Sequence, residues 1–207
     1  YYSTSEAAGF EFQSALAVGK NVGVMLNFAT AGGKDEVTYN GTEYTEKGSG
    51  TYVEAGAGYF KPIENSRFIF ETYAGLGTGS INNAYAASQK SKVGITKFFI
   101  QPSFGYSTKN FECAVSSKLA LARLKVRNNT VTDDVEPTDY QDLVYLQGHT
   151  SALLWEPGVV LRGGFKGLLF TLQVTGSINL QNDWKQETSC TSIGVSIPFQ
   201  LKPAAAR

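Results

Sequence analysis

The sequence predicts an all-β protein, an antiparallel transmembrane β-barrel of ten strands with short periplasmic turns and long outer loops. Three observations support this prediction: a period-two alternation of side chains, an apolar face without central charges, and connections that are alternately short and long. Only 17% of the 207 residues are charged and 13% are aromatic, a balance that argues against disorder. We expect a single domain over residues 1–207, with 201–207 as a C-terminal tail.

The alternation is clear in the first predicted strand, where Phe10, Phe12 and Leu16 share one face and Glu11 and Gln13 share the other. Eight further segments show the same pattern, and each has roughly the length of ten residues that a tilted strand needs to cross a bilayer. These segments are residues 22–29, 52–59, 68–77, 98–106, 112–121, 153–162, 168–177 and 192–200. About nine strands are therefore visible in the sequence.

The connections between these strands differ in length in a regular way. Short turns are expected at 19–21, 62–67, 109–110 and 165–167, and long polar loops at 32–49, 79–92, 127–149 and 181–188. In bacterial outer-membrane barrels the short turns are periplasmic and the long loops are outside.

The less apolar face of each strand consists mainly of Gly, Ala and Ser, with a few isolated charges. A water-exposed face would carry a denser set of charged and polar side chains, whereas small residues suit the crowded interior of a narrow barrel. A soluble barrel or sandwich remains the alternative. We expect the isolated charges to pair inside the barrel, because an unpaired buried charge is costly. This predicted lumen network comprises Glu11, Glu54, Glu71, Lys97, Glu112, Lys118, Glu156 and Arg162.

The strand count leads to an expectation about the N-terminus. Single-chain bacterial barrels have an even number of strands, and the predicted strands near 9–18 and 190–200 both run toward the periplasm. We therefore expect one further strand to precede residues 1–8 and to complete a ten-stranded barrel. In the alternative, residues 1–8 pair irregularly and the barrel closes in another way.

Composition excludes several classes of protein. The net charge is zero, which argues against a nucleic-acid-binding protein, and no run of about 18 apolar residues predicts a transmembrane helix. Cys113 and Cys190 fall near opposite ends of their strands, so we expect no disulfide between them. No cofactor is expected.

Five strand segments carry a resemblance to a known family: residues 9–18, 21–27, 53–60, 70–79 and 97–106. Together they resemble small outer-membrane β-barrel proteins of Bacteroidota type. The resemblance implies a location in the bacterial outer membrane and, as often in that family, a lipidated N-terminal cysteine followed by one more strand. It implies no activity, because the family has no widely established one. The tail at 202–207 departs from the usual aromatic end, for which Phe199 is the candidate.

The predicted loop at 127–149 is the place to look for catalysis. The single histidine, His149, lies near Asp133, Asp134, Asp139 and Asp142, and a His–Asp pair at a barrel rim activates water in omptin-type proteases. The order and spacing match no such motif, so a solvated acidic loop is favoured and no catalytic residue is assigned. Clustered carboxylates also suit Ca²⁺, and the candidates here are Asp133, Asp134, Glu136 and Asp139. Neither an EF-hand spacing nor a glycine turn is present, so a solvated acidic loop is favoured and no metal ligand is assigned.

We therefore expect a non-enzymatic outer-membrane barrel that acts as a structural or accessory subunit on a larger outer-membrane complex. Its other expected partners are outer-membrane lipid and lipopolysaccharide. Two alternatives stay open: a surface adhesin or ligand-binding barrel that uses its outer loops, and a hydrolase at the barrel rim. The loop aromatics suited to an interaction surface are Tyr39, Tyr44, Tyr85, Tyr140, Tyr145 and Trp184.

Overall fold

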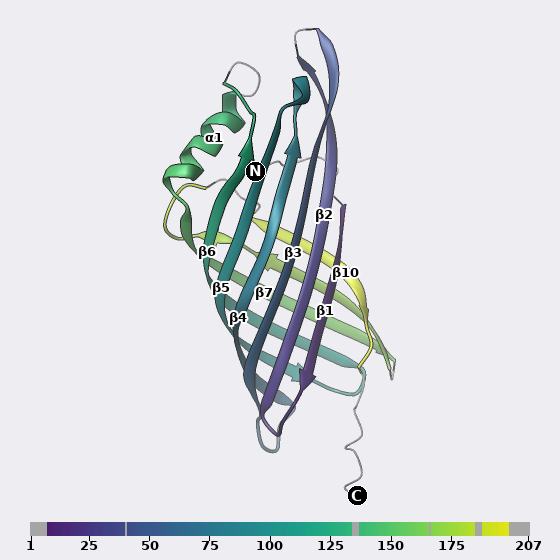
Figure 1. Ribbon diagram of the computed structural model, residues 1–207. Helices are drawn as coiled ribbons and strands as arrows, with labels where there is room; N and C mark the ends of the chain where they lie inside the picture. Colours follow the sequence, from purple (N-terminus) through teal and green to yellow (C-terminus); the bar gives the residue numbers. More distant parts are fainter. Residues whose placement is uncertain (1–7, 40, 134–136, 166, 185–187, 199–207) are drawn as a thin grey trace, which may run out of the picture.

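The computed structural model describes residues 8–39, 41–133, 137–165, 167–184 and 188–198. Within these ranges the chain forms one antiparallel sheet that curls into a half-barrel (Figure 1). The all-β prediction is therefore confirmed. The strands are β1 (Ala8–Ala17), β2 (Val22–Tyr39), β3 (Thr42–Pro62), β4 (Phe68–Ala84), β5 (Lys90–Ser107), β6 (Phe111–Asn129), β7 (Ser151–Phe165), β8 (Leu168–Gly176), β9 (Ile178–Asn179) and β10 (Ser189–Ser196).

Each strand from β1 to β7 pairs with the next strand along the chain, and β8 pairs with β10. The two residues of β9 continue the line of β8, because both segments pair with β7. The described strands thus occupy nine adjacent positions in the sheet, in agreement with the nine segments that the alternation predicts.

The two edges of the sheet are β1 and β10, which are not paired with each other in the described part of the chain. Neighbouring strands run in opposite directions, so the first and the ninth positions run in the same direction. The sheet curls enough for an amide contact on its inner side, where Gln13 Nε2 donates to Gln173 Oε1 at 3.1 Å. That bond brings β1 close to β8.

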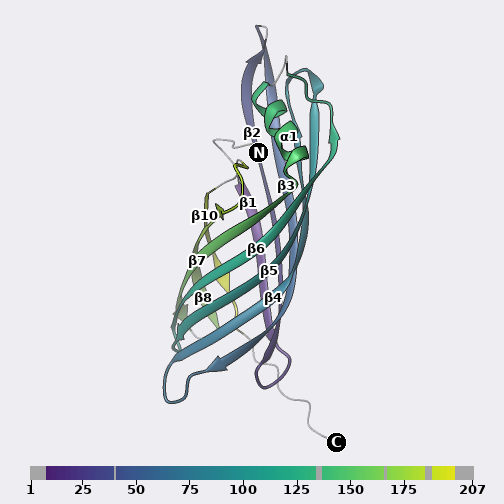
Figure 2. The same ribbon diagram turned by 90° about the vertical axis from the view of Figure 1, so that its left-hand side faces the viewer.

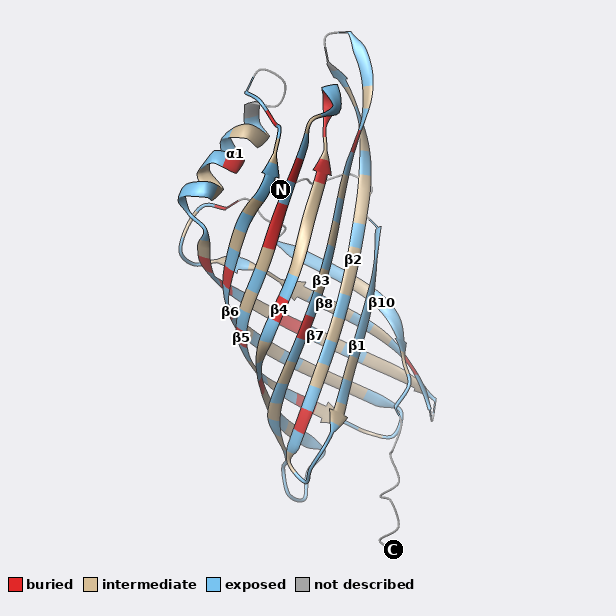
Figure 3. Cartoon of the chain, in the orientation of Figure 1, coloured by how far each residue is buried: buried red, intermediate tan, exposed pale blue. Residues whose placement is uncertain are grey.

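Side chains point alternately to a convex and a concave face, and the burial of the residues changes accordingly along the central strands (Figure 3). On the convex face, apolar residues line up in register across six strands. One such row is Leu26, Ala55, Leu76, Phe98, Leu121 and Leu153, and the next is Val24, Ala57, Ala74, Ile100, Leu119 and Trp155. The concave face holds the buried residues, among them Tyr73, Phe99 and Leu154.

The strands are longer than expected at the end of the sheet that carries Gly41, which we call the upper end. The predicted loop at 32–49 is mostly strand, since β2 and β3 stay paired up to Tyr39 and Thr42. Only two residues connect them, and Gly41 has φ +74°, a conformation that glycine adopts without strain. The predicted loop at 79–92 is likewise strand on both sides of a short 3-10 helix, η1 (Ala86–Ser88).

The predicted loop at 127–149 contains a helix that the sequence patterns did not predict, α1 (Pro137–Gly148). Proline at the first helical position and Asp139 in the first turn both favour a helix start there. Figures 1 and 2 show α1 beside the upper ends of the strands. Leu143 of α1 packs with Val93 and Leu124, which lie on the concave side of β5 and β6. The helix therefore covers part of the concave face at the upper end.

Candidate functional site

The concave face carries a buried carboxylate at the centre of the sheet. Glu54 of β3 is only 2% exposed, and both of its carboxylate oxygens accept hydrogen bonds from Lys118 Nζ, at 2.8 and 2.7 Å. Tyr52 Oη donates to the same carboxylate at 3.1 Å and Asn27 Nδ2 at 3.2 Å. The carboxylate is thus saturated by donors from β2, β3 and β6.

A second carboxylate extends this cluster. Glu156 of β7 accepts a hydrogen bond from Lys97 Nζ at 2.5 Å and lies 3.9 Å from Lys118 Nζ. The Lys118 ammonium also lies over the ring of Phe99, 4.5 Å from its centroid. Two acids and two bases therefore form one electrically balanced cluster, which we call the central network: Glu54, Lys97, Lys118 and Glu156.

The strand register brings these residues together. Lys118 and Glu156 are direct partners across β6 and β7, and Glu54 and Lys97 are both partners of Gly77 in β4. Gly77 leaves room for the network, because a Cβ there would overlap the Tyr52 hydroxyl. Glycine at this position is required for close packing on the concave face.

The central network stabilises the curled shape of the sheet. Burying an ion pair brings little net stability, but removing one partner from a buried pair costs about 3 to 5 kcal/mol because the other charge is left unpaired. The network ties β3 to β6 and β5 to β7 across the concave face.

A second ion pair lies lower on the concave face. Arg162 Nη1 donates to Glu112 Oε2 at 3.3 Å, and both side chains are about one third exposed. Glu71, the register partner of Ser103, interacts electrostatically with Arg162 and Glu112. Glu11 lies apart from these groups on the edge strand β1, where its carboxylate accepts a hydrogen bond from Gln13 Nε2 at 2.6 Å.

The structure thus arranges the eight charged residues predicted to form one lumen network into two clusters and one separate residue. Sequence reasoning missed Asn27, Tyr52 and Phe99, which complete the central network. Tyr52 has a sequence signal, because it is two positions from Glu54 and shares its face. Asn27 and Phe99 have none, because their positions beside the network depend on strand register.

The predicted loop aromatics differ in how far they are exposed. Tyr85 and Trp184 are buried, at 5% and 9% exposed. Tyr85 bonds to Asn83 and Ser91, and burial raises the pKa of its phenol, so the hydroxyl stays protonated within these bonds. Of the remaining tyrosines, Tyr44 is half-buried, Tyr140 and Tyr145 pack against buried clusters, and the Tyr39 side chain lies outside the described residues.

Trp184, Tyr145 and His149 instead hold α1 against the upper end of the sheet. Trp184 Nε1 donates to the His149 carbonyl oxygen at 2.7 Å, and the His149 ring stacks on Tyr145 with centroids 4.1 Å apart. His149 Nδ1 also lies 3.0 Å from the Tyr145 carbonyl oxygen. These contacts give His149 a structural position at the end of the helix.

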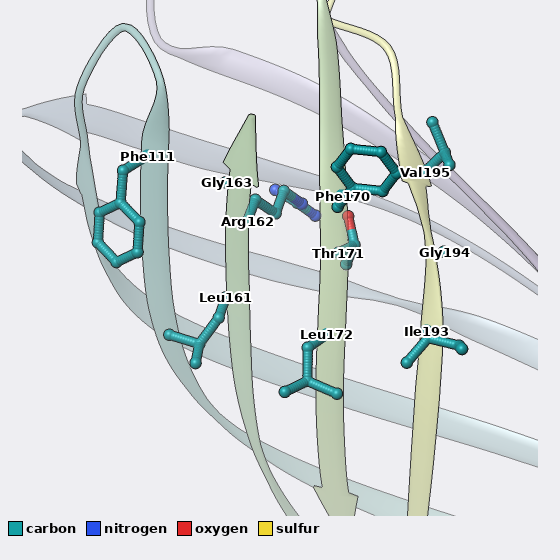
Figure 4. Close-up of a pocket in the computed structure, with 10 residues that line it drawn as sticks. All are labelled: Phe111, Leu161, Arg162, Gly163, Phe170, Thr171, Leu172, Ile193, Gly194 and Val195. Atoms are coloured by element: carbon teal, nitrogen blue, oxygen red, sulfur yellow. The ribbon is translucent and has the colours of Figure 1, made fainter. Parts of the chain in front are cut away.

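A shallow groove of about 570 Å³ lies on the convex face (Figure 4). Phe111, Gly163 and Phe170 lie in one row across β6, β7 and β8. Because glycine has no side chain, the groove lies between the two aromatic rings. Leu161, Leu172 and Ile193 form the next row. The apolar lining suits contact with hydrocarbon.

Among the described residues, no group of three or more His, Cys, Asp or Glu side chains is placed to hold a metal ion. Asp134 and Glu136 lie outside those residues. None of the described helices is both long and apolar enough to span a membrane. Comparisons with protein-family models, curated proteins and solved structures found no match to this chain.

Proposed function

We propose that this chain is a non-enzymatic outer-membrane β-barrel protein and serves as a structural or accessory subunit of a larger outer-membrane complex. The observation that carries the proposal is the convex face, where apolar residues lie in register across six strands. Soluble monomeric proteins rarely expose apolar patches larger than a few hundred Å². A bilayer is the environment in which such a surface is stable.

The concave face supports a structural role. A transport channel needs an open polar path, whereas the central network and the cluster around Trp184 fill the concave side with bonded and packed side chains. An enzyme needs a nucleophile or a general base near a cavity, and the residues nearest to the buried carboxylates are lysines already bonded to them. The arrangement of the charged residues thus favours a structural role over a catalytic one.

The membrane part of the proposal is tested by extraction and gel mobility. We expect the chain to stay with the membrane fraction in sodium carbonate and to need detergent for extraction. We also expect it to migrate differently on a denaturing gel before and after boiling, because the folded sheet resists dodecyl sulfate. Full solubility without detergent would overturn the proposal.

The edges of the sheet support docking on a partner. Unpaired backbone groups are costly in lipid, so the outer sides of β1 and β10 need further polypeptide against them. Phe10 of β1 and Ile193 of β10 are 62% and 86% exposed. In native membranes, a photo-crosslinker at Ile193 is expected to capture a larger outer-membrane protein, and the same group at Ile100 in the middle of the sheet serves as the control. Equal capture at both positions would argue against docking through the edge.

A second candidate function is ligand binding at the cell surface. It is favoured by the β2–β3 hairpin, which extends seven residues beyond Gly32, the partner of Ala8 at the start of β1. Replacing the hairpin tip at 36–45 with a two-residue turn tests it. If the hairpin binds a ligand, the shortened protein stays folded and loses binding to the cell surface or matrix material that the parent protein binds.

A further inference from the structure

Six basic residues gather on the convex face at the upper end of the sheet. All six side chains are exposed, and none forms an ion pair with another residue that the structure describes. They come from the four strands β2, β3, β5 and β6. We call this set the basic rim: Lys34, Lys47, Lys90, Lys92, Lys125 and Arg127.

The strand register concentrates positive charge within the basic rim. Lys34 and Lys47 are direct partners across β2 and β3, and Lys47 and Lys90 are both partners of Ala84 in β4. Arg127 lies over Gly94, where a Cβ would meet its guanidinium group. Like charges placed directly opposite each other destabilise a sheet. An anion bound between them would remove this repulsion.

The rim has a defined position relative to the apolar rows. A polar row lies two rows above the row that contains Leu26 and Leu76. In it, Thr30, Thr51 and Ser80 are in register. The rows with Lys92 and with Lys34 and Lys47 follow. The order from apolar to hydroxyl to basic side chains matches the order from hydrocarbon to interface to headgroup in a bilayer leaflet.

A groove of about 320 Å³ lies within the rim. Three ammonium groups and two amide side chains are available along it, a set of donors that suits phosphate oxygens. Carboxylates on the same face lie closer to the hairpin tip, at Glu36 and Glu43. The polar residues of the groove on the convex face are Lys47, Ser49, Asn82, Lys90, Lys92 and Asn128.

We propose that the basic rim binds the phosphate groups of anionic glycolipids in the outer leaflet. This inference rests on the proposed function, because the rim meets headgroups only if the convex face is embedded in the bilayer. It assigns a defined binding site and a ligand class to a protein whose convex face otherwise contacts only acyl chains. The bound phosphates would neutralise the Lys34–Lys47 repulsion and fix the depth of the protein in the membrane.

The test compares lipid binding by the full chain in detergent with two matched triple variants. The first, K47Q/K90Q/K92Q, removes three charges from the rim, and the second, K20Q/K61Q/K109Q, removes three charges at the opposite end of the sheet. The probes are lipopolysaccharide, the same lipid with its phosphates removed, phosphatidylcholine and inorganic phosphate. Native mass spectrometry and a thermal-shift titration measure the binding.

We expect the parent protein to retain the phosphorylated glycolipid, and raised salt to weaken this binding. Each lysine near an anionic membrane surface contributes about fivefold to binding, so the rim variant should bind on the order of a hundredfold more weakly. The opposite-end variant should bind as the parent does. Inorganic phosphate alone should give no thermal shift, because the acyl chains contribute to binding.

Three results would overturn this inference. They are equal weakening by both triple variants, equal retention of the phosphorylated and the dephosphorylated lipid, and a full effect of inorganic phosphate alone. Each can occur while the protein still needs detergent and changes mobility on boiling, so each leaves the proposed function standing. Solubility without detergent would instead overturn both proposals.

Discussion

Lys118 Nζ is bonded to both carboxylate oxygens of Glu54, although the two residues are 64 positions apart in the chain. Lys118 belongs to β6 and Glu54 to β3, which are separated in the sheet by β4 and β5. A bond across three strand positions spans the concave face, and it holds only while the sheet keeps its curl. This contact therefore links the local charge pairing to the shape of the whole molecule.

The first prediction concerns this pair. Lys118→Met should lower the free energy of unfolding by about 3 to 5 kcal/mol, because it leaves the Glu54 carboxylate buried without its cation. Adding Glu54→Gln should restore much of the loss, since the double variant carries no unpaired charge at this position. Urea titration in lipid vesicles, followed by tryptophan fluorescence, measures the parent protein and both variants. Equal losses in the single and double variants would contradict the coupling.

The second prediction concerns Gly77. Gly77→Ala should destabilise the protein, because the added methyl group overlaps the Tyr52 hydroxyl and displaces it from Glu54. The matched control is Gly194→Ala, since a Cβ at Gly194 meets no atom within 4 Å. The urea concentration at the midpoint of unfolding should be lower for Gly77→Ala than for the parent protein and unchanged for Gly194→Ala. A similar effect of both would point to backbone entropy, not to crowding at the network.

The third prediction concerns the tryptophan that holds α1. Trp184→Phe removes the hydrogen bond to the His149 carbonyl oxygen, a loss of about 1 kcal/mol, and should loosen the helix without unfolding the sheet. Protease cleavage within 137–148 should become faster. Trp155→Phe is the control, because Trp155 donates to Ser117 on the convex face, away from α1. If cleavage rates do not change, α1 is held by its leucine contacts alone.

The fourth prediction concerns the order of amide exchange along the sheet. In the protein reconstituted without partners, β1 and β10 should exchange faster than β4 and β5, because within the described residues each edge strand is paired on one side only. Hydrogen–deuterium exchange with mass spectrometry measures this order. Uniform protection from β1 to β10 would mean that other polypeptide pairs with the edges.

The sequence predicts the faces of this fold well because alternation is a local property. Phe10 and Phe12 lie on the convex face, and Glu54 lies on the concave face, as their positions in the pattern indicate. Register is not local, so no sequence pattern could place Lys97 beside Glu156 or Asn27 beside Glu54. The eight charged residues of the predicted network all lie on the concave face, but their division into two clusters depends on which strand positions face each other.

The upper end carries local sequence signals that side-chain alternation alone does not reveal. Asn40 and Gly41 form a dipeptide that is typical of two-residue hairpin turns, and it marks the β2–β3 turn inside the predicted loop. Pro137 followed by Asp139 marks the start of α1. The helix has only a weakly apolar face, so periodicity alone does not reveal it. Its stability comes from Leu143 packing on the sheet, which is a tertiary contact.

The order of strands in the sheet also has a consequence for how the chain folds. From β1 to β8, every ladder joins strands that are consecutive in the chain. All of these hairpins except β6–β7, whose connection contains α1, can therefore close over a short loop at a low entropic cost. The contacts that span many residues, such as Glu54 with Lys118, can form only after several hairpins have already associated. We therefore expect growth of the sheet hairpin by hairpin, with curling as the late and slow step.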